Sequence, residues 1–308
     1  MRIVFMGTPD FAVPSLEALV AAGHEVCGVF CQPDKPVGRH QNKLQPPAVK
    51  VCAQGHNIPV FQPTKLRDGT ALAQLQELNP ELIVVAAYGR ILPQEILDLP
   101  PKGCINVHSS LLPRYRGAAP INWAVVNGDK ETGVTIMKVA PELDAGDILG
   151  QVSTPIDPEE TVETVHDRLA GLGGELLVKV VEEIAGGTVQ AVPQDPQLVT
   201  YAPMLSRSLA PIDWSQSANA IHNKVRGLVP WPATSTDVFS KEPVKVFAVA
   251  ETGERTGKAP GTVLAARPEG IDVACGDGMV LRILELQAPG SRRMAAADYL
   301  RGHPITIA

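Results

Sequence analysis

Residues 104–117 read CINVHSSLLPRYRG, a β-strand pattern that runs into a turn and carries several polar side chains. The apolar run through Val107 predicts a buried strand, and Pro113 marks the turn after it. Because strand side chains alternate between two faces, Asn106 and His108 would project from the same face near the strand's carboxyl end. That edge is where open α/β sheets bind their ligands. Taken alone, the segment is explained equally well by two polar residues that cap a strand.

The chain before this segment alternates between strand patterns and helix patterns. We expect strands at residues 2–6, 25–31 and 82–87 and helices at residues 13–22, 46–54 and 68–79. The run LIVVAA at 82–87 is wholly apolar, which is typical of a central parallel strand buried on both faces. The alternation predicts an α/β fold with a doubly wound, mostly parallel, Rossmann-like sheet and right-handed crossovers.

The first strand runs into a glycine, an arrangement that invites a dinucleotide-binding interpretation. The fingerprint G-x-G-x-x-G is absent, however, because Thr8, Pro9, Asp10 and Phe11 follow Gly7. Without the second glycine the backbone cannot approach a pyrophosphate closely, so NAD binding is not expected.

Beyond the opening segment we expect a helix at 117–129, strands at 134–139 and 148–155, and a long helix at 159–185. After Gly187 the sequence turns proline-rich and aperiodic, which is typical of an interdomain linker.

A short helix pattern at 217–227 then precedes five short alternating segments: 236–239, 243–250, 261–266, 271–275 and 279–287. Strands at this spacing, separated by turn residues, predict a small OB-like β barrel. We therefore predict an N-terminal α/β domain at 1–188, a linker at 189–207 and a C-terminal barrel domain at 208–308.

Composition places the chain among ordinary globular proteins. Of its 308 residues, 44% are hydrophobic and 19% are charged, and this length favours two domains. No apolar run approaches the roughly 18 residues that span a bilayer, and we see no signal peptide, so we expect a cytoplasmic protein without a membrane partner. The five cysteines are odd in number and lack C-x-x-C spacing, which indicates free thiols and no metal site.

Charge is unevenly spread along the chain, whose formal net charge is −6. Residues 206–308 hold 12 Lys and Arg against 10 Asp and Glu, whereas residues 1–205 hold 15 against 23. A polyanionic partner would therefore meet the C-terminal part, although an asymmetry this small also arises by chance. The proline-rich cationic stretch 32–47 predicts a loop long enough to have a function, or else a solvated surface excursion.

Asn106, His108 and one of the acids in PELDAGDILG (141–150) form a candidate catalytic group. An imidazole is the commonest general base, a carboxylate can orient it, and an amide can donate a hydrogen bond to a developing oxyanion. Acyl transfer to an amine requires these three roles. Ser109 and Ser110 lie outside a G-x-S-x-G elbow, so direct transfer without a covalent intermediate fits better. Such a trio also occurs by accident in many chains.

A family resemblance extends this interpretation. The run NVHSSLLPRYRGAAPINWAVVNGD followed by MKVAPELDAGDIL resembles the formyltransferases that use 10-formyltetrahydrofolate as formyl donor. Further runs resemble the branch of that superfamily whose acceptor is methionyl-tRNA: IVFMGTPDFAVPSL, QPDKPVGR, AAYGRILP, TYAPML, IDWSQSA and IHNKVRGLVPWPA. Together these segments span nearly the whole chain, including the predicted barrel.

The resemblance implies that Asn106, His108 and Asp144 are the catalytic trio. The α-amino group of initiator methionyl-tRNA would attack the formyl carbon on N10 of the folate. Asn106 and protonated His108 would stabilise the oxyanion, and Asp144 would orient the imidazole. Asp147 lies in the same turn and is the acid most easily mistaken for it.

The resemblance also implies binding residues. Those for tetrahydrofolate would be Ser110, Leu111, Leu112 and Pro113 together with Ala87, Tyr88, Gly89 and Ile91. Those for tRNA would be Arg39, Lys43, Arg207, Lys224 and Arg226, with the C-terminal barrel as the tRNA-binding domain. The chain departs from the family pattern at 39–44, which reads RHQNKL, and after Ser206, where Arg207 replaces a lysine; this substitution keeps the charge but changes its geometry.

Two other functions stay open. A relative with the same catalytic domain could formylate a small amine or an amino sugar nucleotide, although the additional C-terminal barrel favours the larger acceptor. A folate-binding or RNA-binding protein could also keep the fold without catalysis, against which the intact trio argues. A monomer is the default expectation.

Overall fold

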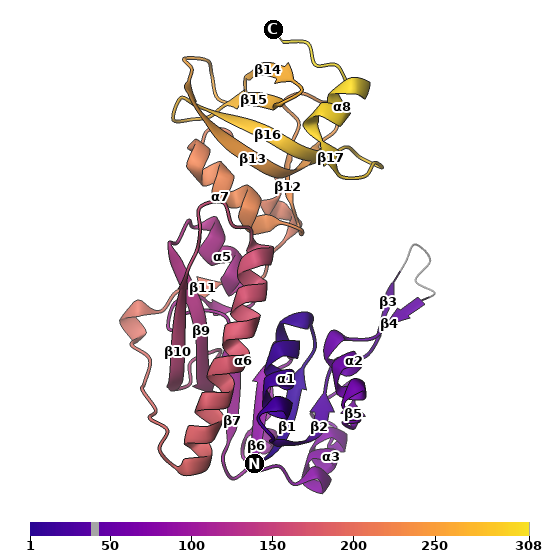
Figure 1. Cartoon of the computed structure of the whole chain (residues 1–308), viewed down its shortest axis with the longest axis vertical. Coiled ribbons are helices and arrows are strands. Elements are labelled where there is room, and N and C mark those ends of the chain that lie inside the picture. Colours follow the sequence, from indigo (N-terminus) through magenta and orange to yellow (C-terminus); the bar gives the residue numbers. More distant parts are fainter. Residues whose placement is uncertain (38–42, 308) are drawn as a thin grey trace. The chain divides into compact units, whose positions relative to one another are not determined.

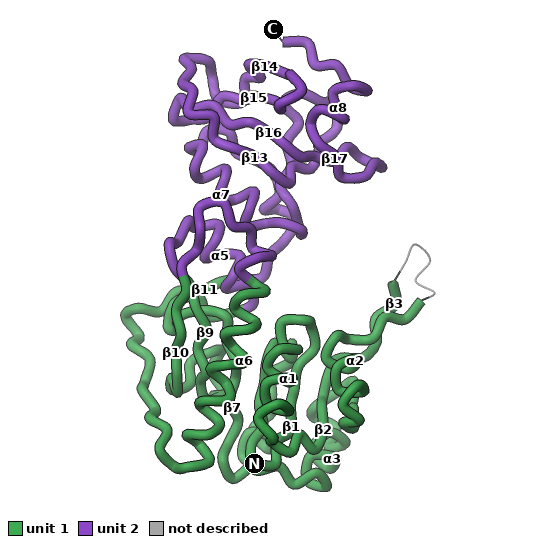
Figure 2. Tube along the Cα trace, in the orientation of Figure 1, with its two compact units in different colours: residues 1–117, 132–154, 166–202 green, residues 118–131, 155–165, 203–308 purple. Residues whose placement is uncertain are grey.

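The computed structural model describes residues 1–37 and 43–307. Contacts between residues divide the chain into two compact units, shown in Figure 2. Unit 1 holds residues 1–117, 132–154 and 166–202, and unit 2 holds residues 118–131, 155–165 and 203–308.

Unit 1 is built on a seven-stranded sheet in the order β10-β9-β7-β6-β1-β2-β5, whose strands lie side by side in Figure 1. Its strands are β1 (Arg2–Gly7), β2 (Glu25–Phe30), β5 (Val60–Phe61), β6 (Leu82–Ala86), β7 (Cys104–His108), β9 (Glu131–Lys138) and β10 (Ile148–Pro155). The pairings β5-β2, β2-β1, β1-β6 and β6-β7 are parallel, whereas β9 pairs with β7 antiparallel. The expected mostly parallel, doubly wound sheet is therefore confirmed.

Helices cover both faces of this sheet. They are α1 (Val13–Ala21), α2 (Ala48–Gly55), α3 (Thr70–Leu78), α4 (Gln94–Leu97) and α6 (Val162–Gly186), with a 3₁₀ turn, η1 (Asp10–Ala12), before α1. On one face, Val4 and Met6 of β1 share a core with Leu75 of α3 and Ile96 of α4. The intervening strand residues point to the opposite face by the alternation of a strand.

Close packing on that opposite face explains a glycine pair inside α6. A Cβ on Gly173 would lie 3.1 Å from Val107 of β7, and one on Gly174 would lie 2.8 Å from the carbonyl oxygen of Pro14 in α1. Glycine weakens a helix interior by roughly 0.5–1 kcal/mol relative to alanine, a cost offset here by the close approach of α6 to β7 and α1. Figure 1 shows α6, α1 and α2 side by side along this face.

Unit 2 contains α5 (Pro120–Val126), α7 (Ala218–Leu228), α8 (Ala296–Gly302) and six antiparallel strands in a barrel-like sheet. The strands are β12 (Thr234–Thr236), β13 (Val244–Arg255), β14 (Val263–Arg267), β15 (Gly270–Ala274), β16 (Met279–Gln287) and β17 (Met294–Ala295), paired in the order β12-β13-β16-β15-β14 with β17 on β16. Ile221 and Val225 of α7 pack into the same core as Leu281 and Ile283 of β16. The expected C-terminal β barrel is confirmed as an antiparallel, barrel-like sheet.

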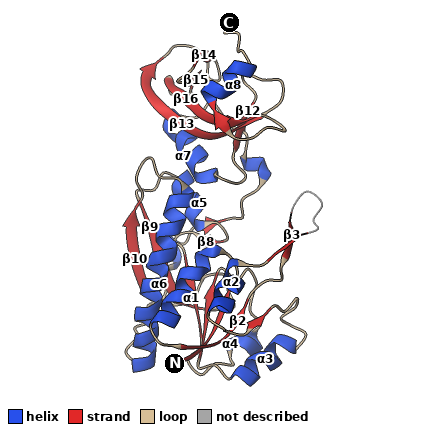
Figure 3. Cartoon of the chain, turned by 45° about the vertical axis from the view of Figure 1, so that its right-hand side comes forward, coloured by secondary structure: helices blue, strands red, loops and turns tan. Residues whose placement is uncertain are grey.

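Several local expectations were wrong. The stretch 32–47 contains a short antiparallel hairpin, β3 (Lys35–Val37) with β4 (Lys43–Gln45), rather than only loop (Figure 3). The strand expected at 236–239 ends at Thr236, because Ser240 N donates to Asp237 O and closes a turn. Helix α5 begins at Pro120 rather than 117, because Gly117 belongs to β8 (Arg116–Gly117), which pairs with β11 (Tyr201–Ala202).

The predicted domain boundaries at 188 and 208 stay a prediction. Contacts assign two segments of the predicted N-terminal domain, 118–131 and 155–165, to unit 2, and they divide the predicted linker after Ala202. Two short 3₁₀ turns, η2 (Pro196–Leu198) and η3 (Arg207–Leu209), lie on either side of that division. Among the residues described, no helix is both long and apolar enough to cross a bilayer.

A buried acid ties three strands of unit 2 together. Asp272 of β15 is 1% exposed, and its carboxylate accepts hydrogen bonds from Arg282 of β16 at 2.6 and 3.0 Å and from Arg267 of β14. Burial alone would raise the pKa of Asp272, but the hydrogen bonds from the two arginines outweigh it and hold this pKa below its ordinary value. A depressed folded-state pKa means that the ion pairs stabilise unit 2 above the unfolded pKa of about 4, and that this stabilisation is lost as the pH falls through the folded value.

Replacing Asp272 by Asn should therefore lower the free energy of unfolding of unit 2 by about 3 kcal/mol at neutral pH, the low end for breaking a buried ion pair, because both arginines reach solvent. The difference from wild type should shrink below about pH 4. Urea denaturation followed by tryptophan fluorescence measures this, since Trp123, Trp214 and Trp231 all lie in unit 2. Glu285→Gln, which removes a surface partner of Arg293, is the control. A loss as large in this control would contradict the assignment.

Candidate active site

Asn106 and His108 lie at the carboxyl end of β7, between two strands that hold them in register. Asn106 is opposite Val85 of β6 and Met137 of β9, and His108 is opposite Thr135 of β9. Both residues follow Cys104 at two-residue intervals along the strand, and Cys104 packs into the core beneath α3 and α4. The two polar side chains therefore share the face on which that core lies, as the alternation predicted.

Two acceptors face the two ring nitrogens of His108, whose side chain is buried. Its Nε2 is 3.0 Å from the carbonyl oxygen of Tyr115, and its Nδ1 is 3.8 Å from Oδ2 of Asp144. A carbonyl oxygen only accepts, so Nε2 carries the proton in that contact. The Asp144 separation is an ion-pair distance rather than a hydrogen bond. The backbone of Tyr115 therefore sets the ring's orientation, and Asp144 contributes its charge.

The backbone of Asp144 is in a left-handed conformation, with φ of 47°, and hydrogen bonds from remote residues hold it there. Its Oδ2 accepts a hydrogen bond from Gly117 N at 2.8 Å, and its carbonyl oxygen accepts one from the side chain of Gln194 at 2.8 Å. Asp147 of the same turn instead lies 3.4 Å from Lys138 Nζ, and its side chain is 40% exposed. The structure thus brings Asp144, not Asp147, to the imidazole.

The turn Ser110–Pro113 is fixed by polar side chains of the neighbouring strands. Thr135 Oγ1 donates to Ser110 O at 2.7 Å and accepts from Leu112 N at 3.1 Å, and Gln151 Nε2 donates to Leu112 O at 2.8 Å. The side chains of Ser110 and Leu112 are themselves buried. The turn can therefore offer a ligand backbone groups and the partly exposed side chains of Leu111 and Pro113.

The loop after β6 follows the strand that pairs with β7, so it begins beside the end of β7. Ala87 and Gly89 have positive φ values of 48° and 79°. The carbonyl oxygen of Tyr88 between them accepts hydrogen bonds from Thr8 Oγ1 and Gln32 Nε2, each at 3.1 Å. The ring of Tyr88 is buried, and burial raises its pKa to about 12. Its side chain therefore belongs to the core, and only its backbone is available to a ligand.

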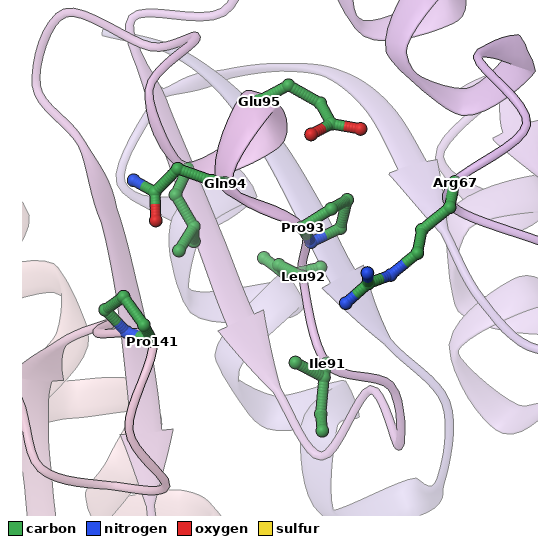
Figure 4. Close-up of a pocket in the computed structure, with 8 residues that line it drawn as sticks. Arg67, Ile91, Leu92, Pro93, Gln94, Glu95 and Pro141 are labelled. Carbon is green, nitrogen blue, oxygen red and sulfur yellow. The ribbon is translucent and has the colours of Figure 1, made fainter.

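Ile91 differs from Tyr88 because its side chain is 78% exposed. It lines an open cavity of about 500 Å³ in unit 1. The other lining residues are Arg67, Leu92, Pro93, Gln94, Glu95, Leu97 and Pro141. Figure 4 shows Arg67 reaching toward Leu92 and Pro93. The family resemblance implied only Ile91 of these residues, although Leu92 and Pro93 lie in the same AAYGRILP run and Pro141 lies in PELDAGDILG.

The predicted tRNA contacts have different surroundings. Arg39 lies outside the described residues, while Lys43 at the start of β4 and Arg207 in η3 are exposed. Lys224 of α7 is half-buried, and its Nζ donates to Pro211 O at 2.6 Å. Burial lowers the pKa of Lys224, partly opposed by the nearby Asp213.

We expected Arg226 to be an exposed cation, and the structure contradicts this. Its side chain is 6% exposed, and its guanidinium donates to Glu160 O at 2.8 Å, to Asp157 O at 3.3 Å and to Asn223 Oδ1 at 2.9 Å. Helical periodicity alone did not reveal that segment 155–165 covers this face of α7. Arg226 is thus a structural link within unit 2.

No cysteine among the described residues offers an activated thiolate. Burial raises the pKa of Cys104, two residues before Asn106, to about 12 and that of Cys31 to about 11. A thiol of this kind stays protonated at neutral pH and is a poor nucleophile. This supports direct transfer at the site rather than a thioester intermediate.

One cluster of potential metal ligands lies away from the described catalytic residues in sequence. Glu17 of α1 accepts a hydrogen bond from Cys52 at 3.1 Å and contacts His56 Nε2 at 2.8 Å. Burial and Glu17 together raise the pKa of Cys52 to about 12. Because both carboxylate oxygens are already bonded and the thiol is protonated, these contacts account for the cluster without an ion.

Similarity to known proteins shows the family to which this chain belongs. The family model described as formyl transferase matches residues 1–181, and that described as formyl transferase, C-terminal domain, matches residues 204–304. The methionyl-tRNA formyltransferase of Moorella thermoacetica is 52% identical over 305 residues, covering 99% of this chain and 97% of that protein. That of Halalkalibacterium halodurans is 48% identical over 302 residues, covering 98% and 95%. The chain belongs to the methionyl-tRNA formyltransferase family.

Solved structures share the fold of this family member at lower identity. An N-formyltransferase from Helicobacter canadensis, in complex with folinic acid and dTDP-3-aminofucose, has a TM-score of 0.71 at 19% identity, covering 92% of this chain and 98% of that one. HypX from Aquifex aeolicus, in complex with tetrahydrofolic acid, has a TM-score of 0.66 at 20% identity, covering 100% and 48%. At these identities the likeness concerns the fold.

Sequence reasoning missed the residues that hold the site together, namely Thr135, Gln151 and Gln194. Thr135 and Gln151 lie in strands that the sequence predicted, but a polar side chain in a strand is usually interpreted as facing the solvent. Gln194 lies in a stretch without periodicity. Only the position of Thr135 among the apolar residues that open the VTIMKV run could have pointed to it.

Gly146 gives a test of how the Asp144 turn is held. A Cβ at this position would lie 1.8 Å from Lys138 O, although the backbone conformation itself suits alanine. Gly146→Ala must therefore shift the turn, and a displacement near 1 Å should lower the rate of formyl transfer about 100-fold. Gly55→Ala, where a Cβ would meet nothing within 4 Å, is the matched control. Equal rates for both variants in a steady-state assay would show that the turn tolerates the shift.

Proposed function

We propose that this chain transfers the formyl group of 10-formyltetrahydrofolate to the α-amino group of methionyl-tRNA, using Asn106, His108 and Asp144. The observation that carries the proposal is Asp144 Oδ2 at 3.8 Å from His108 Nδ1, beside Asn106 at the end of β7. It occurs in a chain about half identical, over nearly its whole length, to methionyl-tRNA formyltransferases. The product is N-formylmethionyl-tRNA, the initiator of protein synthesis, and no metal takes part.

The reaction needs one bond formed and one broken at the formyl carbon. The amine nitrogen attacks that carbon, and its carbonyl electrons move to the oxygen to give a tetrahedral oxyanion. The bond to N10 then breaks, the carbonyl re-forms, and N10 gains the proton that the amine loses. Formylmethionyl-tRNA and tetrahydrofolate are released, so no covalent enzyme intermediate is needed.

The roles we assign follow from the hydrogen-bonding capacity of each side chain. The half-buried amide of Asn106 can donate to the oxyanion, and a preorganised donor of this type is typically worth about 10²–10³ in rate. Because Nε2 of His108 donates to Tyr115 O, the lone pair of the imidazole is on Nδ1, which can take the proton from the amine and pass it to N10. Asp144 keeps a negative charge beside the imidazole while that proton is in transit.

For the donor, we propose contacts from the backbone of Ala87, Tyr88 and Gly89 and from the side chain of Ile91. The turn Ser110–Pro113 would add backbone groups and the side chains of Leu111 and Pro113. Both segments follow the carboxyl ends of β6 and β7, where ligands bind in sheets of this type. Ala87 and Gly89, which have positive φ values, are exposed there.

For the acceptor, we propose phosphate contacts from Lys43 and Arg207, which are exposed, and from Lys224 once its bond to Pro211 is exchanged. Arg39, four positions before Lys43 in the sequence, is proposed on sequence alone. We further propose initiator tRNA as the preferred acceptor, a catalytic domain within 1–188, a tRNA-binding domain within 208–308, a monomeric state and a cytoplasmic location.

His108→Ala should abolish most of the catalytic rate, with kcat lower by at least about 100-fold, because proton transfer and oxyanion stabilisation both depend on the imidazole. Transfer of labelled formyl groups to methionyl-tRNA measures this, alongside the unfolding temperature to confirm an intact fold. The exposed His56 gives the control, His56→Ala. A His108→Ala protein that keeps its rate would contradict the mechanism. Formylation of an amino sugar nucleotide, but not of methionyl-tRNA, would select the other acceptor class.

Binding of methionyl-tRNA should weaken steeply with salt, by about tenfold or more between about 50 and 200 mM, as two or three phosphate contacts require. Filter binding or anisotropy measures the slope. Lys43→Ala and Arg207→Ala should each reduce the salt slope by the amount that one phosphate contact contributes. Lys179→Ala on α6 should leave the slope unchanged. A flat response in the wild type would remove these side chains from the RNA interface.

A further inference from the structure

Residues 192–202, which we call the strap, run along unit 1 after α6 and touch both loops that surround His108. Val192 forms an antiparallel bridge with Ile148 at the start of β10. At the other end, Tyr201 and Ala202 form β11, which pairs with Arg116 and Gly117 of β8. The sequence predicted only a linker here, yet the strap is hydrogen-bonded to the body of unit 1 near both of its ends.

Gln194 connects the strap to the Asp144 turn. Its Nε2 donates to the carbonyl oxygens of Asp144 and Gly146, each at 2.8 Å. Its Oε1 accepts from Nε of Arg116 at 3.1 Å and from Nη2 of Arg116 at 2.8 Å. Arg116 is 7% exposed. Because the amide meets two acceptors on one side and two donors on the other, only this orientation satisfies it.

Thr200 connects the strap to the segment that carries Tyr115. Tyr115 N donates to Thr200 Oγ1 at 2.9 Å, and Arg116 N donates to Thr200 O at 2.9 Å. Thr200 N in turn donates to Pro113 O at 3.3 Å. The carbonyl of Tyr115 is the group that holds Nε2 of His108.

We propose that Gln194 and Thr200 are positioning residues that fix the two groups facing the nitrogens of His108. Gln194 holds Asp144 opposite Nδ1, and Thr200 holds Tyr115 opposite Nε2. Asp144 needs such support because its backbone is left-handed, a conformation that persists in non-glycine residues when the surroundings over-determine it. Neither positioning residue contacts the reacting atoms. The kinetic part of this proposal rests on the proposed function, and the structural part does not.

Gln194→Glu is the sharpest variant. It keeps an acceptor for Arg116 but replaces the donor to Asp144 O and Gly146 O with an oxygen that repels them. The fold should survive, kcat for formyl transfer should fall about 100-fold, and KM for both substrates should stay near wild type. Gln190→Ala, an exposed residue just before the strap, should behave as wild type. A Gln194→Glu protein with wild-type kcat would overturn the proposal.

A double-mutant cycle separates positioning from an independent effect. Because Gln194 acts through Asp144, Gln194→Glu should cost little in an Asp144→Ala background. Losses that multiply would overturn the assignment. For Thr200, Thr200→Val removes the acceptor of Tyr115 N and should lower kcat in the Asp144→Ala background as well, whereas Thr188→Val outside the strap should not.

Amide hydrogen exchange tests the structural part without an activity assay. Gln194→Glu should speed exchange in residues 142–147, and Thr200→Val should speed it in residues 114–117, relative to their control variants. If these exchange changes occur but the wild type does not formylate methionyl-tRNA, the proposed function is wrong and the positioning role of Gln194 and Thr200 is supported. Unchanged exchange in both segments would contradict the positioning role of Gln194 and Thr200, whatever the activity.

Discussion

The burial of one imidazole between two acceptors constrains the rest of unit 1. His108 sits at the end of β7 with Tyr115 O at 3.0 Å and Asp144 Oδ2 at 3.8 Å. Strand pairing fixes only the histidine; both acceptors come from irregular segments that have no intrinsic preference for these positions. Their placement needs further hydrogen bonds, and the loops and the strap around the strand end supply them.

Those loops approach one another so closely that side chains would obstruct them. Gly117, with φ of 118°, donates to Asp144, and a Cβ there would lie 2.7 Å from Ala202 O. Gly146 packs against Lys138 O with still less room. The glycines in the PRYRG and LDAGD runs therefore serve close backbone approach. Each loop on its own costs conformational entropy, and their mutual hydrogen bonds offset that cost.

The fold could be predicted where a sequence pattern allowed only one structural interpretation. The apolar run at 82–87 required a strand buried on both faces, and it became β6 in the centre of the sheet. Prediction failed where the partner was remote in sequence. Arg226 reads as a surface cation on α7 until segment 155–165 covers it, and residues 192–202 read as a linker until they pair with β8 and β10.

The sequence by itself determined the alternation of strands and helices, the shared face of Asn106 and His108, and the family. Local periodicity and near-complete similarity are properties of the chain that require no partner. The family resemblance implied Asp144 rather than Asp147, but only the tertiary structure showed why Asp144 meets the imidazole and which residues hold it there. Asp144 and Asp147 are chemically alike in the sequence; a left-handed backbone and hydrogen bonds from Gly117 and Gln194 distinguish them. Those contacts join residues up to 50 positions apart.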